Sequence, residues 1–272
     1  MVMEKPDSLY GLFQYYLNVA AFDIGELERR CAARRVLDNK VLEEGVPYSK
    51  LLEVLNEAPK DDKAPVELYY PQIHSEIRMA FTHVSRAVIG LCDKDGDSLR
   101  DLLEATPAGD YKSLEALVRA CCVAPNDEYQ KKEIEGANGH LLRARMDARK
   151  GQFETTELVV RSVFDYYLKY GIYVIDGKRL ISEFEKRSKR SRNLYEKGKL
   201  AEALGNHSAA VSIYGDAVCT LDEAGEYLGY HAPSLDTTKI LYEARRSNRL
   251  LRLGFKTGID FVGWLEGHLP GA

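Results

Sequence analysis

The chain has 272 residues, of which 45% are hydrophobic and 29% are charged, which is enough apolar material for one large helical domain or two ordinary ones. No stretch approaches the roughly 18 to 20 consecutive apolar residues that a membrane span requires, and the start, MVMEKPDSLY, lacks the apolar run of a secretory signal. We therefore expect a folded cytoplasmic protein that does not enter a membrane.

The net charge of −4 hides an uneven distribution. Residues 1–130 carry 15 Lys and Arg against 23 Asp and Glu, a charge of −8, whereas residues 131–272 carry 23 against 19, a charge of +4. This split favours two surfaces with different partners or two copies that meet head to tail. The five cysteines have no C-x-x-C spacing, so we expect reduced thiols that pack as small hydrophobes.

Helical periodicity dominates the sequence. Apolar residues follow the alternating four and three spacing of a helix stripe in the segments 13–31, 73–91 and 134–148. Small alanines in the third segment would let a neighbouring helix approach closely. Further helices are expected near residues 49–57, 112–122, 154–170, 179–204, 208–228 and 236–253.

Strand signals are sparse in comparison. No two alternating segments are joined by an Asn-Gly or Asp-Gly turn, and the β-rich patch at 170–178 is too short to form a sheet alone. We predict an all-α fold, an antiparallel bundle or array of about nine helices that ends in a C-terminal helical hairpin.

Residues that favour helix ends support this prediction. Pro71 suits a first helical turn, Ser182 with Glu185 has the spacing of a capping box, Gly229 follows the last apolar residue of its segment, and Asp236 can cap the next helix. We expect a helix boundary at each of these positions.

Three units are expected along the chain. The segment 37–65 is rich in proline and charge and is the best candidate for a linker. We predict N-terminal helices in 1–60 that dock on the body, a helical core in 66–175 and a basic helical hairpin domain in 178–272.

The first helical segment carries a recognisable motif. Residues 16–31, YLNVAAFDIGELERRC, contain Gly25, Glu26, Leu27 and Arg29 in the order Gly-Glu-Leu-x-Arg. This stretch resembles the motif of the translin and Trax family over 16 of 272 residues. The resemblance implies a helical nucleic-acid binder, and some members of that family use carboxylates to cleave RNA.

A second local motif lies in the next helical segment. Arg78 and His83 have the Arg-x4-His spacing, which resembles the site of HEPN ribonucleases and implies an RNA-cleaving pair. At about 100° per residue the two side chains point about 140° apart on a helix.

The stretch 92–104 has oxygen ligands at the spacing of an EF-hand loop. Its acids fall at loop positions 1, 3, 5, 9 and 12, namely Asp93, Asp95, Asp97, Asp101 and Glu104. The resemblance implies a calcium site, but Ser98 replaces the glycine that folds the loop and Arg100 replaces an apolar residue. We favour the alternative, a turn at Asp95-Gly96 followed by a capped short helix.

The helix expected over 133–150 carries titratable residues on one side. His140 and Arg143 lie within one turn of each other and are candidates for a catalytic site. Glu133, His140 and Asp147 are seven residues apart, about 10.5 Å per step, so the three cannot share one metal ion. The alternative is a salt bridge from Arg143 to Asp147, with His140 bonded to a neighbouring helix.

Residues 192–230 form the most informative stretch. Gly205, Ala210, Tyr214 and Ala217 have the spacing of a tetratricopeptide turn and second helix. The segment resembles a tetratricopeptide or MIT-like hairpin, and its ending also resembles an archaeal hairpin domain of unknown function. These resemblances imply two closely packed antiparallel helices from an archaeal source, next to a groove that binds a peptide or helix.

Basic residues concentrate in 178–199, with nine Lys and Arg against three Glu, and in 239–256, with six against one. If both segments face the same way, they form a surface suited to phosphates. The nucleic-acid-binding candidates are Arg187, Arg190, Arg192, Arg245, Arg246 and Arg249, with Tyr195 placed to stack on a base. The alternative is a solvated face that pairs with the acidic front half of the chain.

No motif predicts a cofactor or a known enzyme class, since the sequence lacks a Gly-rich phosphate loop, a G-x-S-x-G motif and an HExxH motif. We favour an interaction protein without enzymatic activity, which binds a protein partner or a second copy through the C-terminal hairpin region. The alternative is an RNA-binding or RNA-processing protein that uses the basic helices 178–199 and 239–256, with Arg78 and His83 as a nuclease pair.

Overall fold

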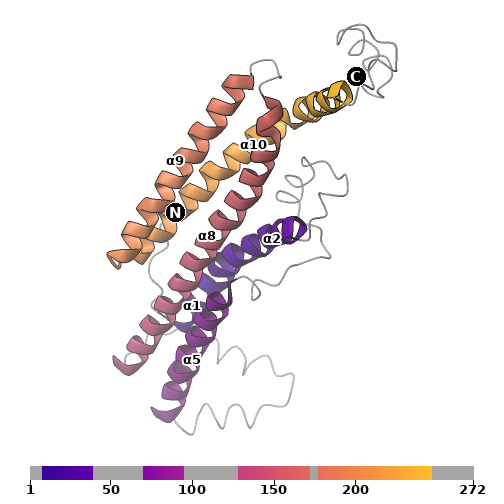
Figure 1. Cartoon of the computed structure of the whole chain (residues 1–272). Coiled ribbons are helices and arrows are strands. Elements are labelled where there is room, and N and C mark those ends of the chain that lie inside the picture. Colours follow the sequence, from indigo (N-terminus) through magenta and orange to yellow (C-terminus); the bar gives the residue numbers. More distant parts are fainter. Residues whose placement is uncertain (1–7, 39–69, 95–127, 172–176, 247–272) are drawn as a thin grey trace.

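A computed structural model describes residues 8–38, 70–94, 128–171 and 177–246. Every element in these ranges is helical and none is a strand, so the all-α prediction is confirmed for this part of the chain. The number of about nine helices stays a prediction. In chain order the elements are α1 (Leu9–Tyr15), the π-helical segment η1 (Tyr16–Ala20), α2 (Ala21–Asp38), α5 (Pro71–Lys94), α8 (Glu128–Gly171), α9 (Gly177–Ala203) and α10 (His207–Arg246) (Figure 1).

Helix α8 connects all the other described helices. Its first half lies along α5 and the N-terminal helices, and its second half lies along α9 and α10 (Figure 1). Two separate helices were expected over this range, yet α8 is continuous through Gly151. A side chain there would lie 3.0 Å from the Tyr70 ring and 3.1 Å from Leu27. Glycine therefore lets the helix pass close to α5 and α2 without ending.

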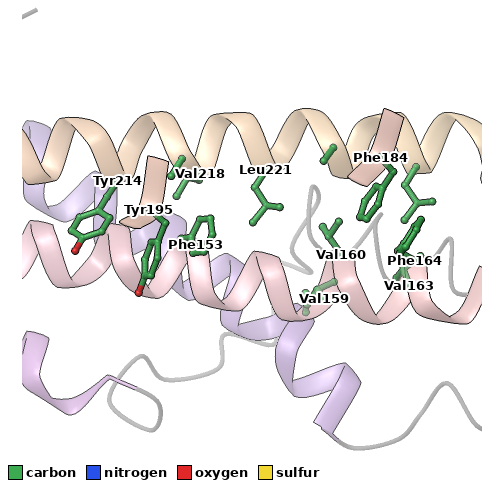
Figure 2. Packing of buried hydrophobic residues seen from close by; sticks show 14 of the residues in the cluster. Phe153, Val159, Val160, Val163, Phe164, Phe184, Tyr195, Tyr214, Val218 and Leu221 are labelled. Carbon is green, nitrogen blue, oxygen red and sulfur yellow. The ribbon is translucent and has the colours of Figure 1, made fainter. Parts of the chain in front are cut away.

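The largest hydrophobic core lies between α8, α9 and α10 (Figure 2). The rings of Phe164 and Phe184 stack at 4.0 Å between centroids, and those of Phe153 and Tyr195 at 4.2 Å. The stripe predicted on the second hairpin helix is fully buried, with exposed fractions of 0 or 1% at Ala210, Tyr214, Ala217, Leu221, Ala224 and Leu228. Burial of this apolar surface holds the hairpin on α8.

The turn between α9 and α10 follows from three consecutive residues, Leu204, Gly205 and Asn206. Gly205 has a φ of +74°, the left-handed conformation that glycine adopts without strain. The amide N–H groups of Gly205 and Asn206 donate to the carbonyls of Glu202 and Ala201, which closes the end of α9. The side chain of Asn206 accepts a hydrogen bond from the Ala209 amide and caps α10.

Three of the four expected helix boundaries are wrong, and two of these three lie within α10. Helix α10 runs through Gly229, Pro233 and Asp236 without a break, because the buried stripe continues at Ala232 and Leu235 and fixes the chain as a helix. Packing thus outweighs the local preference of glycine and proline to end a helix.

The capping box predicted from Ser182 and Glu185 also lies inside α9, which begins at Gly177. In contrast, α5 does begin at Pro71, as expected from the tolerance of a first turn for proline.

Two groups of buried polar contacts hold α2 on the body. The Asp23 carboxylate, 1% exposed, accepts from Arg145 and pairs with Arg149 of α8 at 2.9 and 2.6 Å. Arg30 reaches Asp222 of α10 through two hydrogen bonds of 2.7 and 2.8 Å and Thr156 of α8 through a third. The contacts of Arg30 therefore join α2, α8 and α10, which belong to the three different units expected from the sequence.

The main core also crosses the predicted boundary near residue 176, since α8 supplies one side of it and the hairpin the other. None of the helices in the described ranges combines the length and apolar character needed to cross a bilayer.

Candidate functional site

Helices α5 and α8 bring two histidines together. The rings of His83 and His140 stack with centroids 5.2 Å apart and planes inclined by 30°. The two residues are half-buried and lie 57 positions apart in the chain. Helices α5 and α8 pack side by side, and His83 lies at the level of Gly136 of α8.

Each histidine is held by a carboxylate from the opposite helix. Nδ1 of His83 lies 2.6 Å from Oε2 of Glu133, and Nδ1 of His140 lies 2.7 Å from Oε2 of Glu76. A carboxylate at Nδ1 fixes the orientation of an imidazole and leaves Nε2 as the outward nitrogen. Neither Nε2 has a hydrogen-bond partner in the described part of the chain and neither is sealed from solvent.

Arg143 completes the cluster. Its Nε donates to Oε2 of Glu76 at 2.9 Å, and its Nη2 lies 2.7 Å from Nδ1 of His140. Nδ1 of His140 can donate to Glu76 when it carries a proton, or accept from Arg143 when it does not. The hydrogen-bond partner of Nδ1 therefore depends on which ring nitrogen of His140 carries the proton.

Gly136 makes room for the pair. A methyl group at this position would lie 2.8 Å from Cε1 and Nδ1 of His83, closer than side-chain atoms approach one another. The absence of a side chain on this turn of α8 lets the His83 ring lie against the helix backbone, beside His140. Gly136 of α8 thus makes room for the ring of His83 of α5.

Cationic side chains lie along the same face. Arg86 is one turn from His83 on α5, and Lys132 is one turn from Gly136 on α8; both are exposed. Arg143, which is one-third exposed, lies at the other end of the histidine pair. The cluster thus combines the carboxylates of Glu76 and Glu133 with nearby cationic side chains on both helices.

Three of the four predicted catalytic candidates come together in this cluster, namely His83, His140 and Arg143. Arg78, the fourth, is exposed and lies about 140° around the helix from His83. The predicted Arg143 to Asp147 salt bridge is wrong, because Arg143 bonds Glu76 and Asp147 bonds Lys150 at 3.0 Å.

Glu76 was not identified from the sequence. It lies 64 residues from the histidine that it orients, and no spacing within one helix signals a partner that lies on another helix.

Metal binding gains no support from the described residues. Among them, no three or more His, Cys, Asp or Glu side chains lie close enough together to hold an ion. The candidate calcium loop, for which a capped turn was the favoured interpretation, begins at Asp93 in the last turn of α5, and its other possible ligands, Asp95, Asp97, Asp101 and Glu104, lie outside the described residues.

Several of the predicted nucleic-acid-binding residues make contacts within the protein. Arg192 donates to Glu157 of α8, and Arg187 donates to Glu183 and lies 4.4 Å above the Tyr227 ring. Arg190 is exposed. Arg245 and Arg246 end α10, where the backbone alone is described, and Arg249 lies outside the described residues.

The burial of Tyr195 argues against its predicted role in base stacking. Its ring is 8% exposed and faces Phe153 on one side and Tyr214 on another. Its hydroxyl donates to Glu154 at 2.6 Å. Burial raises the pKa of this hydroxyl, and the neighbouring Glu154 carboxylate raises it further. Tyr195 therefore belongs to the core and has no free face for a nucleotide.

An apolar pocket lies at the contact of α1, α5 and α8, and we call it the α1–α5 pocket. It is a small pocket that opens to the surface, with a cavity volume of about 50 Å³. Its lining is entirely apolar or aromatic and consists of Leu9, Leu12, Phe13, Tyr16, Ala80, Phe81, Val84 and Leu141. Phe13 and Phe81 at its rim are 57% and 49% exposed.

Comparisons of the chain with protein-family models, with curated proteins and with solved structures gave no match. The histidine cluster and the α1–α5 pocket are therefore the two features whose chemistry points to a function.

Proposed function

We propose that the protein is a helical interaction protein that binds a partner protein, and that the α1–α5 pocket receives the partner. The observation that carries this proposal is the pair of half-exposed aromatic side chains, Phe13 and Phe81, on the rim of a wholly apolar pocket. Exposed apolar surface with this arrangement is typical of protein docking sites.

The hairpin groove, where partner binding was expected from the sequence, is occupied by the protein's own α8. The buried stripe of α10 faces Phe153, Val160 and Phe164 of that helix (Figure 2). Among the hairpin side chains that the structure describes, the large hydrophobic ones that are exposed lie near its ends, at Leu200, Leu204 and Tyr230. The α1–α5 pocket is therefore the better candidate for a partner.

The chemistry of the pocket favours an amphipathic helix as its ligand. A helix that presents apolar residues at every third and fourth position would place them between α1 and α5, as in other helix-in-groove complexes. The exposed Arg78 lies one turn from Phe81 at the rim, and α1 has no acidic residue in its first turn. A partner helix with acidic residues beside its apolar stripe would match this rim.

Site-specific photo-crosslinking tests the proposal. A photoreactive phenylalanine analogue in place of Phe81 should capture a helix of another protein in cells, whereas the same analogue in place of Leu204 should not. The captured helix, made as a labelled peptide, should then bind the purified protein, and Phe13→Ser with Phe81→Ser should weaken binding at least about tenfold. Tyr230→Ser, at an exposed aromatic on α10, is the matched control.

The proposal fails if the crosslinks at Phe81 join only segments of the same chain or two copies of it. It also fails if no crosslink forms.

RNA binding is a second candidate, and the exposed basic side chains of α9 favour it. Lys186, Lys189, Arg190 and Lys197 are all exposed. The Ser191 hydroxyl donates to the Ala217 carbonyl, which fixes the level of this part of α9 against α10. Arg246 lies 29 residues further along α10, about 40 Å at 1.5 Å per residue. The two basic segments are therefore better treated as separate surfaces.

Salt-dependent binding of a labelled RNA tests this candidate. Affinity should fall steeply between low and moderate salt and should drop further with Arg190→Glu. If the protein does not bind the RNA at low salt, RNA binding through α9 is excluded.

A further inference from the structure

We propose that His83 and His140 form a general acid–base pair that cleaves single-stranded RNA by internal transesterification. This activity is independent of partner binding at the α1–α5 pocket and of RNA binding through the basic side chains of α9. It rests on the geometry of the histidine cluster and on the charges that surround it.

The arrangement of the two imidazoles suits proton transfer. Each ring is oriented through Nδ1 by a carboxylate, at 2.6 Å for His83 and 2.7 Å for His140, and Nε2 of neither ring has a hydrogen-bond partner in the described part of the chain. The ring centroids are 5.2 Å apart, so both rings lie within the reach of one phosphodiester group and its neighbouring ribose. One neutral and one protonated ring then provide a proton acceptor and a proton donor at the same substrate.

The surrounding charges select an anionic substrate. Arg143 at one end of the pair, and Arg86 and Lys132 at the other, offer cations to a phosphate and to its neighbours along a chain. Glu76 and Glu133 contact Nδ1 of the histidines and so hold the rings from the side away from Nε2. An extended phosphodiester lying along the α5–α8 face would satisfy these cations better than a single small anion.

RNA is the substrate class that this set of groups can cleave unaided, since its 2′-hydroxyl serves as the nucleophile. The neutral histidine removes the proton of the 2′-hydroxyl while the 2′-oxygen attacks phosphorus and forms the new P–O2′ bond. The P–O5′ bond breaks, and the protonated histidine gives its proton to the leaving 5′-oxygen. The products are a 2′,3′-cyclic phosphate and a 5′-hydroxyl, so atoms and protons balance.

Asparagine variants separate catalysis from the structural role of the pair. The amide of asparagine reaches the position of histidine Nδ1 and keeps a hydrogen bond to the carboxylate, but it has nothing in the position of Nε2. We expect His83→Asn and His140→Asn each to reduce cleavage by about 100-fold or more, while the melting temperature stays close to that of the unaltered protein. His74→Asn, at an exposed histidine on the same helix, is the matched control and should leave cleavage unchanged.

The assay uses the full chain, a fluorescently labelled single-stranded RNA and a metal chelator. The expected products carry a 2′,3′-cyclic phosphate, the rate should show a bell-shaped dependence on pH, and an RNA with 2′-O-methyl groups should remain intact. Binding of the 2′-O-methyl RNA, followed by anisotropy, reports on RNA affinity separately from cleavage. If Arg190→Glu weakens binding while the cleavage rate of bound RNA is unchanged, both RNA proposals hold.

The inference is overturned if the unaltered protein leaves the RNA intact. It is also overturned if His83→Asn and His140→Asn cleave as fast as the unaltered protein, because the activity then belongs to another site. A loss of cleavage that tracks a fall in melting temperature in both variants would assign the pair to holding α5 on α8, and would overturn it as well.

Discussion

At the scale of single residues, small side chains decide where helices meet. Gly136 admits the His83 ring, and Gly198 admits the Tyr214 ring, whose Cε1 would lie 2.6 Å from an added methyl group. Tyr214 is fully buried and donates to Glu202 at 2.7 Å. Despite the partial burial of Glu202, the hydrogen bonds from Tyr214 and Lys150 lower its pKa. The close contact of α9 with α10 at this end of the hairpin thus requires a glycine at position 198.

Gly198→Ala should therefore destabilise the protein. The added methyl group must displace a buried ring, and overpacking of this kind costs about 1 to 3 kcal/mol, more than alanine gains as a better helix former. Urea unfolding measures the change. Gly25→Ala is the control, since nothing lies within 4 Å of its added methyl group, and it should raise the free energy of unfolding slightly. Equal stability of the two variants would contradict this account of the hairpin.

Arg30 is the most buried cation described, at 4% exposed, and its Nε has no partner in the part of the chain that the structure covers. Asp222→Ala should cost about 3 kcal/mol in unfolding free energy, because it removes the carboxylate bonded to a buried charge and leaves the Glu26 carboxylate 4.0 Å away. Arg30→Met should cost less, since Asp222 is about one-third exposed and water can solvate it. Chemical denaturation of both variants measures the two losses of stability. A larger loss for Arg30→Met than for Asp222→Ala would contradict this prediction.

At the scale of elements, long helices pass residues that usually end helices. Helix α10 contains Pro233, which has no N–H for the carbonyl one turn earlier and crowds that carbonyl. The buried side chains of Ala232 and Leu235 on either side hold this part of the helix in place. The energy of packing thus decides the length of α10.

Pro233→Ala should stabilise the protein, because it restores a hydrogen bond and removes a clash. The expected gain is about 1 to 3 kcal/mol in the free energy of unfolding. Ser234→Ala, at the next exposed position, should gain less and serves as the control in the same denaturation experiment. A loss of stability in Pro233→Ala would mean that α10 needs the proline to fit its neighbours.

At the scale of the whole molecule, buried hydroxyls and a thiol link stability to pH. Burial raises the pKa of Cys31 to about 11 from its ordinary value of 9.0, and burial also raises the pKa values of Tyr70, Tyr195 and Tyr214. As pH rises, groups of this kind lose their protons at a lower pH in the unfolded state than in the folded state. Their contribution to stability is therefore complete below the unfolded pKa values and is lost as pH rises.

The free energy of unfolding should therefore fall as pH rises through 9 and fall more steeply above 10. Urea unfolding at a series of pH values from neutral to alkaline measures this trend. Cys31→Ala should remove the first part of the decline and leave the part above 10, which the tyrosines cause. Constant or rising stability across this range would contradict the prediction.

The sequence by itself determined the helical class, the buried stripe of α10, the start of α5 at Pro71 and the turn at Gly205. These features depend on local conformational preferences and on periodicity, and both can be read within one helix. A resemblance to a ribonuclease motif drew attention to His83 together with Arg78, and spacing along one helix drew attention to His140 together with Arg143.

Only the tertiary structure decided which faces meet. Periodicity shows that a stripe is buried, but a stripe of alanine and leucine fits many partners, so α8 could take the hairpin groove without any sign in the sequence. Glu76 reaches His140 across 64 residues and Arg30 reaches Asp222 across 192. Contacts over such separations form only when packing brings the helices together, and for that reason the histidine cluster emerged only from the fold.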